Sequence, residues 1–146
     1  MLYTRLTRRL RALRLSRFSD YIALLRSDVG GEREVFINTV TTNLTYFFRE
    51  EHHFDYLQAK VLPVLQQKDS LTPLRIWSAG CSSGEEPYSI AIALSESDVP
   101  RSRTYRLLCT DLNTEMVSQA MNGLYRQEGA RGLSSCLLYT SPSPRD

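Results

Sequence analysis

The sequence contains only three cysteines, Cys81, Cys109 and Cys136, and they are widely spaced. No CxxC pair occurs, so the sequence supports neither a disulfide framework nor a zinc knuckle. This cysteine usage favours a reducing, cytoplasmic setting. No apolar run approaches the roughly 18 residues that a membrane span needs, so direct membrane insertion is not expected.

Acidic residues are absent from the first 17 positions, although the net charge of the whole chain is only +2. Leucines recur there at helical spacing, and at about 100° per residue arginines occupy the opposite side. The leucines are Leu2, Leu6, Leu10 and Leu13, and the arginines are Arg5, Arg8, Arg9 and Arg11. The pattern predicts an amphipathic structural helix rather than a transit peptide, which is also rich in arginine. Its basic side is either a solvated face or a docking surface for an acidic partner.

The first half of the chain has the periodicity of a small all-α domain, predicted to cover residues 1–70. Apolar residues at helical spacing predict further helices over 18–26, 32–40 and 52–67. A valine and two glycines predict a break at 29–31. Residues 41–50, TTNLTYFFRE, are rich in threonine, which favours a loop. Pro63 is expected to kink or end the last helix early, and a linker is predicted at 68–73.

The pattern then changes to alternating strands and helices. Strands are predicted over 74–79 and 104–110, and helices over 89–94 and 114–121, with a stop signal at 122–123. This alternation implies a parallel sheet with right-handed crossovers, the beginning of a doubly wound α/β domain over residues 71–132. Residues 133–146 are mostly small, polar and proline-rich, and they add no strand pattern. We expect them to be a frayed or foreign tail on a truncated domain.

The turn after the first predicted strand has a distinctive chemistry. Its glycines, Gly80 and Gly84, do not follow the GxGxxG spacing of dinucleotide-binding loops. Glu85 and Glu86 open the next helix, where they complement its positive end but would repel a pyrophosphate. A ligand without phosphate and with positive charge fits better, and S-adenosylmethionine is such a ligand. Asp111, at the end of the second predicted strand, would accept hydrogen bonds from its ribose, although a purely structural βα turn stays open.

Other catalytic centres find little support in the sequence. His52 and His53 are adjacent and would point about 100° apart on a helix, whereas zinc helices use histidines four residues apart. Cys81 stands where any small residue would serve, and we interpret it as non-catalytic. Residues 82–84 lack the GxSxG pattern of a nucleophile elbow. We therefore expect no metal site and no nucleophilic side chain.

Three segments carry a resemblance to a known family. In chain order they read RLTRRLRAL, FINTVTTNLTYFFREEHHF and WSAGCSSGEEPYSIAIAL. Together they resemble the CheR family of chemotaxis receptor methyltransferases over residues 2–125. The resemblance implies a helical N-terminal domain followed by a Rossmann-like S-adenosylmethionine-dependent methyltransferase domain. It also implies O-methylation of glutamate side chains on the cytoplasmic methylation helices of chemoreceptors.

The resemblance also implies roles for particular residues. Asn43, Thr45 and Arg49 correspond to cofactor contacts, and Arg49 is a candidate catalytic residue. Glu86 corresponds to the acid near the cofactor's methionine end, and Asp111 to the acid on its ribose. The backbone at Ala79 and Gly80 is expected to line the same pocket. The basic helix resembles the one that recognises the receptor, which gives a partner to Arg5, Arg8, Arg9 and Arg11.

The resemblance fades after residue 126, and the family's later cofactor motifs and small β-subdomain have no counterpart, so the chain as written is expected to be inactive. Two rival functions stay open. One is a nicotinamide-dependent oxidoreductase, which the loop spacing and the two glutamates disfavour. The other is a non-enzymatic ligand sensor or nucleic-acid-binding module. Because the basic helix lacks interleaved aromatic residues on its charged face, no nucleic-acid partner is expected.

Overall fold

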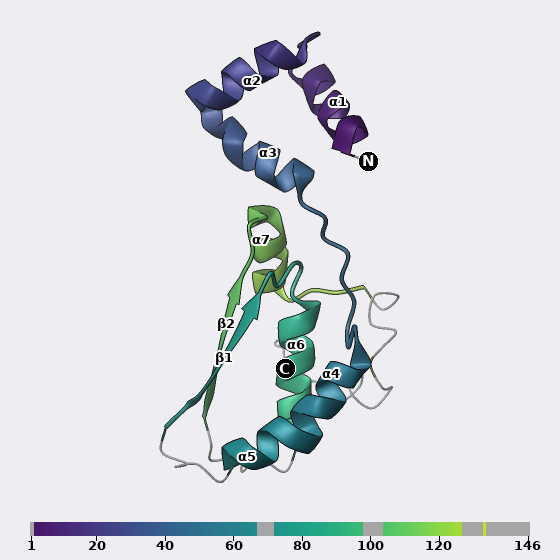
Figure 1. Ribbon diagram of the computed structural model, residues 1–146, viewed down its shortest axis with the longest axis vertical. Helices are drawn as coiled ribbons and strands as arrows, with labels where there is room; N and C mark the ends of the chain where they lie inside the picture. Colours follow the sequence, from purple (N-terminus) through teal and green to yellow (C-terminus); the bar gives the residue numbers. More distant parts are fainter. Residues whose placement is uncertain (1, 67–71, 98–103, 127–132, 134–146) are drawn as a thin grey trace, which may run out of the picture. The chain divides into compact units, whose positions relative to one another are not determined.

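The computed structural model describes residues 2–66, 72–97, 104–126 and 133 (Figure 1). The chain forms two compact units, one of residues 1–43 with 112–115 and one of residues 44–111 with 116–146. The domain boundary near residue 70, which followed the change of pattern, stays a prediction. The predicted linker at 68–73 lies mostly outside the described residues, as does the predicted tail apart from Leu133. No helix within the described ranges has the length and apolar character required to cross a membrane.

The first unit contains three α-helices, as predicted. They are α1 (Leu2–Ala12), α2 (Phe18–Ser27) and α3 (Glu32–Val40). The expected break is a 3₁₀ turn, Val29–Gly31, that follows a left-handed residue at the end of α2, Asp28 with φ 50°. The loop predicted at residues 41–50 is confirmed, because neither helix nor strand occurs there.

The apolar face of α1 is less buried than its pattern predicts. Leu10 is buried, with 5% of its surface exposed, whereas Leu6 and Leu13 are half-buried and Leu2 is 54% exposed. Phe36 of α3 is also only half-buried. A unit of three short helices has a high ratio of surface to volume, so few of its apolar side chains lose contact with water completely.

A buried carboxylate connects the three helices of the first unit. Glu32, which is 4% exposed, accepts hydrogen bonds from Arg9 Nε at 2.9 Å and from the Tyr21 hydroxyl at 2.9 Å. Arg9 Nη2 also forms an ion pair with Oε2 of Glu32, at 2.5 Å. The arginine lowers the pKa of Glu32, and burial, followed by the bond to Glu32, raises the pKa of Tyr21 to about 12. The Glu32 carboxylate of α3 therefore fixes the packing of α1 and α2 against α3.

The second unit begins with a long irregular helix after the loop. It consists of α4 (Glu51–Tyr56), a π-helical turn (Leu57–Val61) and α5 (Leu62–Gln66). Pro63 does not end the helix, contrary to one of the two outcomes expected from it. It lies in the first turn of α5, directly after the widened π turn. A proline fits there because it has no N–H to donate and its ring needs room on the preceding turn.

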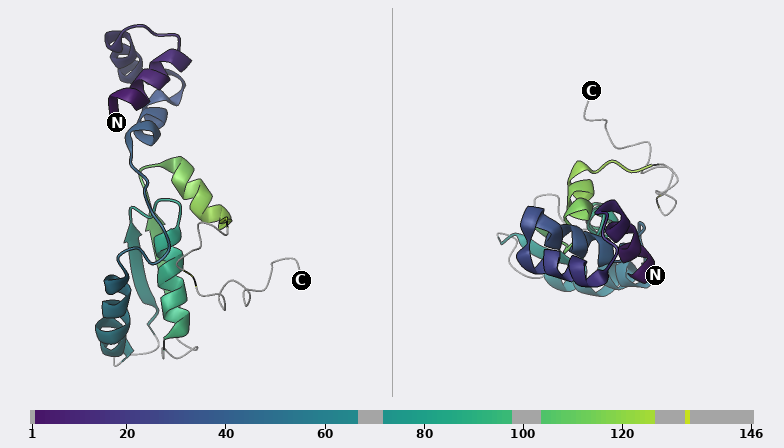
Figure 2. Two further views of the ribbon diagram at one scale, coloured as in Figure 1. Left: turned by 90° about the vertical axis from the view of Figure 1, so that its right-hand side faces the viewer. Right: turned by 90° about the horizontal axis from the view of Figure 1, so that it is seen from above.

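The second unit continues with the predicted βαβα segment. It contains β1 (Leu74–Ala79), α6 (Glu85–Glu96), β2 (Tyr105–Thr110) and α7 (Thr114–Asn122). The two strands are parallel and in register, with Leu74 opposite Tyr105 and Ala79 opposite Thr110. Because they are parallel, both carboxyl ends lie at the same edge (Figures 1 and 2). Residues from the two ends can therefore converge on one ligand.

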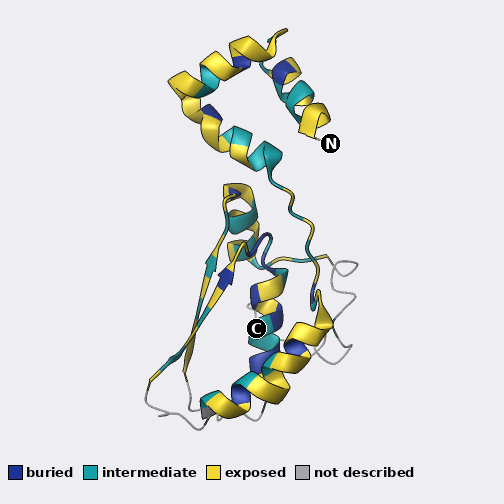
Figure 3. Ribbon diagram, viewed as in Figure 1, coloured by how far each residue is buried: buried dark blue, intermediate teal, exposed yellow. Residues whose placement is uncertain are grey.

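Helix α6 covers one face of the two strands. On that side Ser78 is 1% exposed, and Ala93 and Leu94 of the helix are buried (Figure 3). On the opposite face Trp77 and Leu108 are 66% and 60% exposed. The buried core of this part of the unit is therefore the layer between α6 and the sheet, next to the loop that joins β1 to α6.

Candidate active site

The loop between β1 and α6 closes over the ends of both strands. The backbone N–H groups of Gly80 and Cys81 both donate to the Thr110 carbonyl, at 2.7 and 2.9 Å. Gly80 has a φ of 86°, a left-handed value that favours glycine. A Cβ atom at Gly80 would have no atom within 4 Å, and both Ala79 and Gly80 are exposed. The first part of the loop is therefore open to the approach of a ligand.

Asp111 lies against this loop from the end of β2. Its Oδ2 accepts a hydrogen bond of 2.8 Å from the backbone N–H of Ser82. Ser82 is buried and has a left-handed φ of 49°, which is uncommon for a residue with a side chain. The carboxylate thus holds the strained part of the loop and stands at the edge where the predicted ribose site would be.

Glu86 approaches the same edge from the first turn of α6. Its Oε1 accepts a 2.6 Å hydrogen bond from the hydroxyl of Ser78, near the end of β1. Its neighbour Glu85 accepts a bond of 2.7 Å from the Ser83 hydroxyl. Both carboxylates stabilise the positive end of the helix, and Glu86 stays exposed. A pyrophosphate at this end would meet two like charges, whereas a cationic group would meet complementary ones.

The thiol of Cys81, in the same loop, has a raised pKa. Cys81 is 1% exposed, and burial is the main cause that raises the pKa of its thiol. Nearby Cys109, Asp111 and Glu86 raise this pKa further. A thiol with a raised pKa stays protonated at neutral pH, which fits its interpretation as non-catalytic.

The segment that contains Thr45 and Arg49 is fastened to α6. The Phe48 N–H donates to the Ser89 hydroxyl at 2.9 Å, and this hydroxyl, 0% exposed, donates to the Glu85 carbonyl at 2.6 Å. Phe48 has a left-handed φ of 52°. A bulky residue keeps this conformation only where its surroundings enforce it, and such strain is typical of functional sites.

Arg49 itself is exposed and folds back on its own segment. Its Nη1 donates to the Leu44 carbonyl at 2.7 Å. Thr45 is half-buried. The structure therefore groups Gly80, Glu86 and Asp111 around the loop and fixes the backbone near Arg49 on α6. Asn43, which ends the first segment of the first unit, stays a predicted cofactor contact.

The four arginines predicted to bind a receptor differ in their surroundings. Arg5 Nη1 donates to the Thr41 carbonyl at 2.6 Å, beyond the end of α3, and Arg9 pairs with Glu32. Both are half-buried, whereas Arg8 and Arg11 are exposed. These two form no ion pair with any residue that the structure describes. The basic side of α1 is therefore narrower than its helical pattern predicts.

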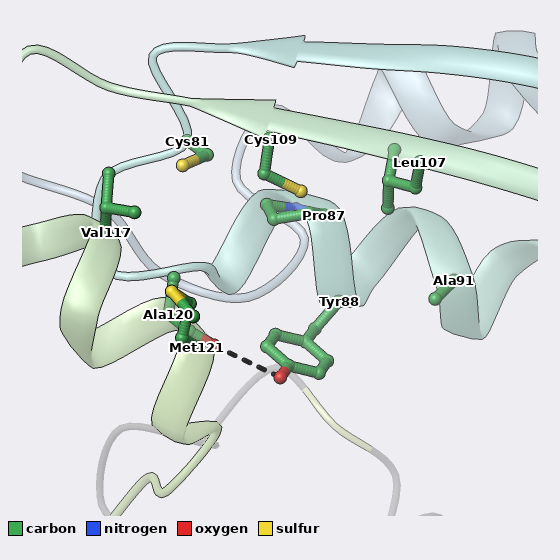
Figure 4. A pocket seen from close by; sticks show the side chains of 9 residues that line it. All are labelled: Cys81, Pro87, Tyr88, Ala91, Leu107, Cys109, Val117, Ala120 and Met121. Carbon is green, nitrogen blue, oxygen red and sulfur yellow. Dashed lines mark hydrogen bonds between the residues drawn. The ribbon is translucent and has the colours of Figure 1, made fainter.

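An apolar cavity of about 320 Å³ lies beneath β2, between α6 and α7 (Figure 4). Leu107 and Cys109 of β2 line it from one side, and Val117 and Met121 of α7 from the other. On its rim the Tyr88 hydroxyl donates to the Ala120 carbonyl at 3.2 Å. Because no charged side chain among the described residues lines this cavity, it does not match the charged groups of S-adenosylmethionine.

Sequence reasoning missed the residues that hold the site together. They are Phe47, Ser78, Ser89 and Tyr125. Ser78 donates to Glu86, Ser89 accepts from the segment before α4, and Tyr125 donates to the loop and packs against Phe47. Ser89 offered a weak signal, since a serine inside an apolar helical stretch needs a partner. Phe47 and Tyr125 have no signal in local sequence, because they contact each other from distant positions.

Comparison with known proteins places the two parts of the chain in one family. The model described as "CheR methyltransferase, all-alpha domain" matches residues 1–41, and the one described as "CheR methyltransferase, SAM binding domain" matches residues 43–142. The predicted fold, a helical domain followed by a methyltransferase domain, is therefore confirmed.

Curated relatives agree with these matches. The "Chemotaxis protein methyltransferase" of Klebsiella aerogenes is 43% identical over 137 residues, which is 92% of this chain and 44% of the relative. That of Escherichia coli is 42% identical over 135 residues, 92% of this chain and 45% of the relative. The "Chemotaxis protein methyltransferase 2" of Pseudomonas aeruginosa is 44% identical over 128 residues, 88% of this chain and 44% of the relative. The chain thus spans less than half the length of these relatives.

Proposed function

The chain belongs to the CheR methyltransferase family, and from this premise we propose that it binds S-adenosylmethionine for the methylation of chemoreceptor glutamates. The observation that carries the proposal is that Asp111 binds the Ser82 N–H of the glycine loop, while Glu86, bound by Ser78 of β1, stands in the first turn of the helix that the loop enters. Two carboxylates and an open Gly80 suit a ligand with a ribose and positive charge. They do not suit the pyrophosphate of a nicotinamide cofactor.

Each acid has a distinct task in this proposal. Asp111 accepts hydrogen bonds from the ribose hydroxyls, while its bond to the Ser82 N–H fixes the carboxylate at the end of β2. Glu86, oriented by Ser78, faces the positively charged methionine part. The exposed backbone at Ala79 and Gly80 lets the ligand lie close to the loop. Asn43 and Thr45 complete the contacts that the family resemblance assigns.

The chemistry needs no general base from this chain. Bound S-adenosylmethionine supplies a methyl group on a sulfonium for in-line transfer to a carboxylate oxygen. A glutamate has a reference pKa near 4.3, so the substrate carboxylate is already ionised at neutral pH. Alignment of the reactants is then the main contribution of the protein, worth up to about 7–11 kcal/mol. Arg49 is the candidate for orienting a carboxylate, either the substrate's or the cofactor's own.

The partner in this proposal is the cytoplasmic part of a chemoreceptor. Exposed Arg8 and Arg11 on α1 are suited to steer an acidic helix, because neither is engaged by a described carboxylate. Arg5 and Arg9 support this surface from inside the unit rather than contacting the partner with their charges. The place of action would accordingly be the cytoplasm.

The proposal is tested with the complete gene product and a chemoreceptor cytoplasmic fragment. Calorimetry with S-adenosylhomocysteine is expected to show saturable binding, and NADH in a parallel titration is expected to show none. Transfer of label from methyl-labelled S-adenosylmethionine to the receptor should yield a base-labile glutamyl ester. Binding of NADH without S-adenosylhomocysteine, or label that resists base, would contradict the proposed function.

A further inference from the structure

Tyr125, shortly after α7, makes contacts with three segments of the second unit. Its hydroxyl donates a hydrogen bond of 2.7 Å to the Ser83 carbonyl in the glycine loop. Its ring meets Phe47 edge-on at a centroid distance of 5.0 Å and Tyr88 of α6 at 5.6 Å. The side chain thus links the loop, α6 and the segment that carries Thr45 and Arg49.

Gly84 leaves the space that the Tyr125 hydroxyl occupies. A Cβ atom at Gly84 would lie 2.5 Å from Tyr125 Oη and 2.9 Å from Ala120 Cβ, which is too close for either. At Gly80, by contrast, the same atom would meet nothing within 4 Å. The two glycines therefore serve different purposes. One opens the loop toward a ligand, and the other admits a tyrosine that contacts the loop from the protein side.

The part of the loop that Tyr125 contacts is strained. Ser82 has φ 49° and Gly84 has φ 103°, so left-handed residues stand on both sides of Ser83. Ser82 also supplies the N–H that binds Asp111 Oδ2. A turn of this kind stays in one conformation only when outside contacts fix it. The peptide between Ser83 and Gly84 also donates its Gly84 N–H to the Cys81 carbonyl at 3.0 Å, and that carbonyl shares a peptide with the Ser82 N–H. Restraining the Ser83 carbonyl therefore also limits the direction of the Ser82 N–H.

We propose that Tyr125 is a positioning residue of the cofactor site, where its hydroxyl holds the Ser83 carbonyl and thereby keeps the Ser82 N–H on Asp111. The inference rests on the proposed function for its ligand, whereas the hydrogen bond from Tyr125 to Ser83 lies within the chain itself. Through Phe47 the same ring also keeps the segment before α4 next to the loop. Tyr125 thus adjusts cofactor affinity through Ser83 and Asp111.

The hydroxyl is available as a donor at all physiological pH values. Burial raises the pKa of Tyr125 above its ordinary value, and the charge of Glu85 raises it further. The phenol therefore keeps its proton wherever the protein is active. The positioning effect should be independent of pH in that range, unlike an effect that needs an ionised side chain.

Tyr125→Phe in the complete gene product tests this role, with Tyr88→Phe as the matched control. The control removes a hydroxyl that donates to Ala120 in α7 and leaves the loop untouched. Tyr125→Phe is expected to weaken S-adenosylhomocysteine binding about three- to tenfold, the usual effect of one lost hydrogen bond. In the ligand-free protein it should also accelerate amide hydrogen exchange at residues 82–84. Tyr88→Phe should do neither.

The results separate this inference from the proposed function. Equal affinity and equal exchange in wild type and Tyr125→Phe would overturn the positioning role, and so would equal losses in the two variants. A wild-type protein that fails to bind S-adenosylhomocysteine would sink the proposed function instead. The exchange measurement then still decides whether Tyr125 holds the loop, because it needs no ligand.

Discussion

Glu32 and Glu86 both stand in the first turn of a helix, but their surroundings differ. Glu32 is 4% exposed and accepts hydrogen bonds from Arg9 and Tyr21. Glu86 is exposed and accepts one from the Ser78 hydroxyl. A carboxylate enclosed by donors fixes the packing of helices, whereas one at an open strand edge is available to a ligand. Local sequence alone, an acid at a helix start, does not distinguish the two uses.

The largest expected effect is on the stability of the first unit. Glu32→Ala leaves Arg9 and Tyr21 without their acceptor, and breaking such a pair is expected to cost about 3 kcal/mol of unfolding free energy. This is the lower end of the usual range, because Arg9 keeps 27% of its side chain exposed. Urea denaturation measures the change. Glu86→Ala is the matched control and should cost less than about 1 kcal/mol, and equal losses would remove the distinction between the two acids.

The next largest effect is expected on cofactor affinity, at the acid that ends β2. Asp111→Asn should weaken S-adenosylhomocysteine binding about 10- to 100-fold, because hydrogen bonds to a charged acceptor are lost. Glu96→Gln, an exposed charge at the far end of α6, is a control for the change in net charge. Calorimetry compares the two variants with wild type. Unchanged affinity in Asp111→Asn would show that the acid at the end of β2 does not contact the cofactor.

Stability should also depend on pH through Glu32. Its pKa is lowered in the folded state, chiefly by the hydrogen bond from Arg9. The stabilisation is therefore complete above the unfolded pKa, near 4.3, and is lost as the pH falls through the lower folded value, by at most about 1.4 kcal/mol per pH unit. Denaturation between pH 3 and 7 tests this. Glu32→Gln should show a shallower decline, and identical slopes would argue against the assignment.

The smallest effect on stability is expected at the exposed arginines. Arg8→Glu combined with Arg11→Glu should change the unfolding free energy by less than about 0.5 kcal/mol. Receptor methylation by the same variant should slow at low salt and approach the wild-type rate at high salt, as screening predicts. Arg5→Ala is expected to lower the unfolding free energy and to leave the salt dependence of methylation unchanged, because Arg5 donates to the Thr41 carbonyl. A normal methylation rate for the double variant at low salt would show that Arg8 and Arg11 form a solvated face and do not bind the receptor.

Much of the framework was predictable because its signals are local. The bounds of β1 and α3, the break after α2 and the loop at 41–50 follow from periodicity, glycines and threonine content. The stop after α7 was also correct, since the Gly123 N–H donates to the Gln119 carbonyl. Local sequence did not specify the winding near Pro63, because a widened π turn is one of several ways to accommodate a proline.

The sequence by itself determined the order of helices and strands, and it placed Asp111 at the end of the second strand and Glu86 at the start of the helix that follows the first. Only the tertiary structure decided which charges are engaged and which stay open. Arg9 meets Glu32 across 23 residues, and Tyr125 meets Ser83 across 42. Periodicity describes one helix or strand at a time, so it identifies the face of an element but not the residues that pack against that face. The different uses of Gly80 and Gly84 have the same origin, because a glycine's purpose depends on the atom that lies against it.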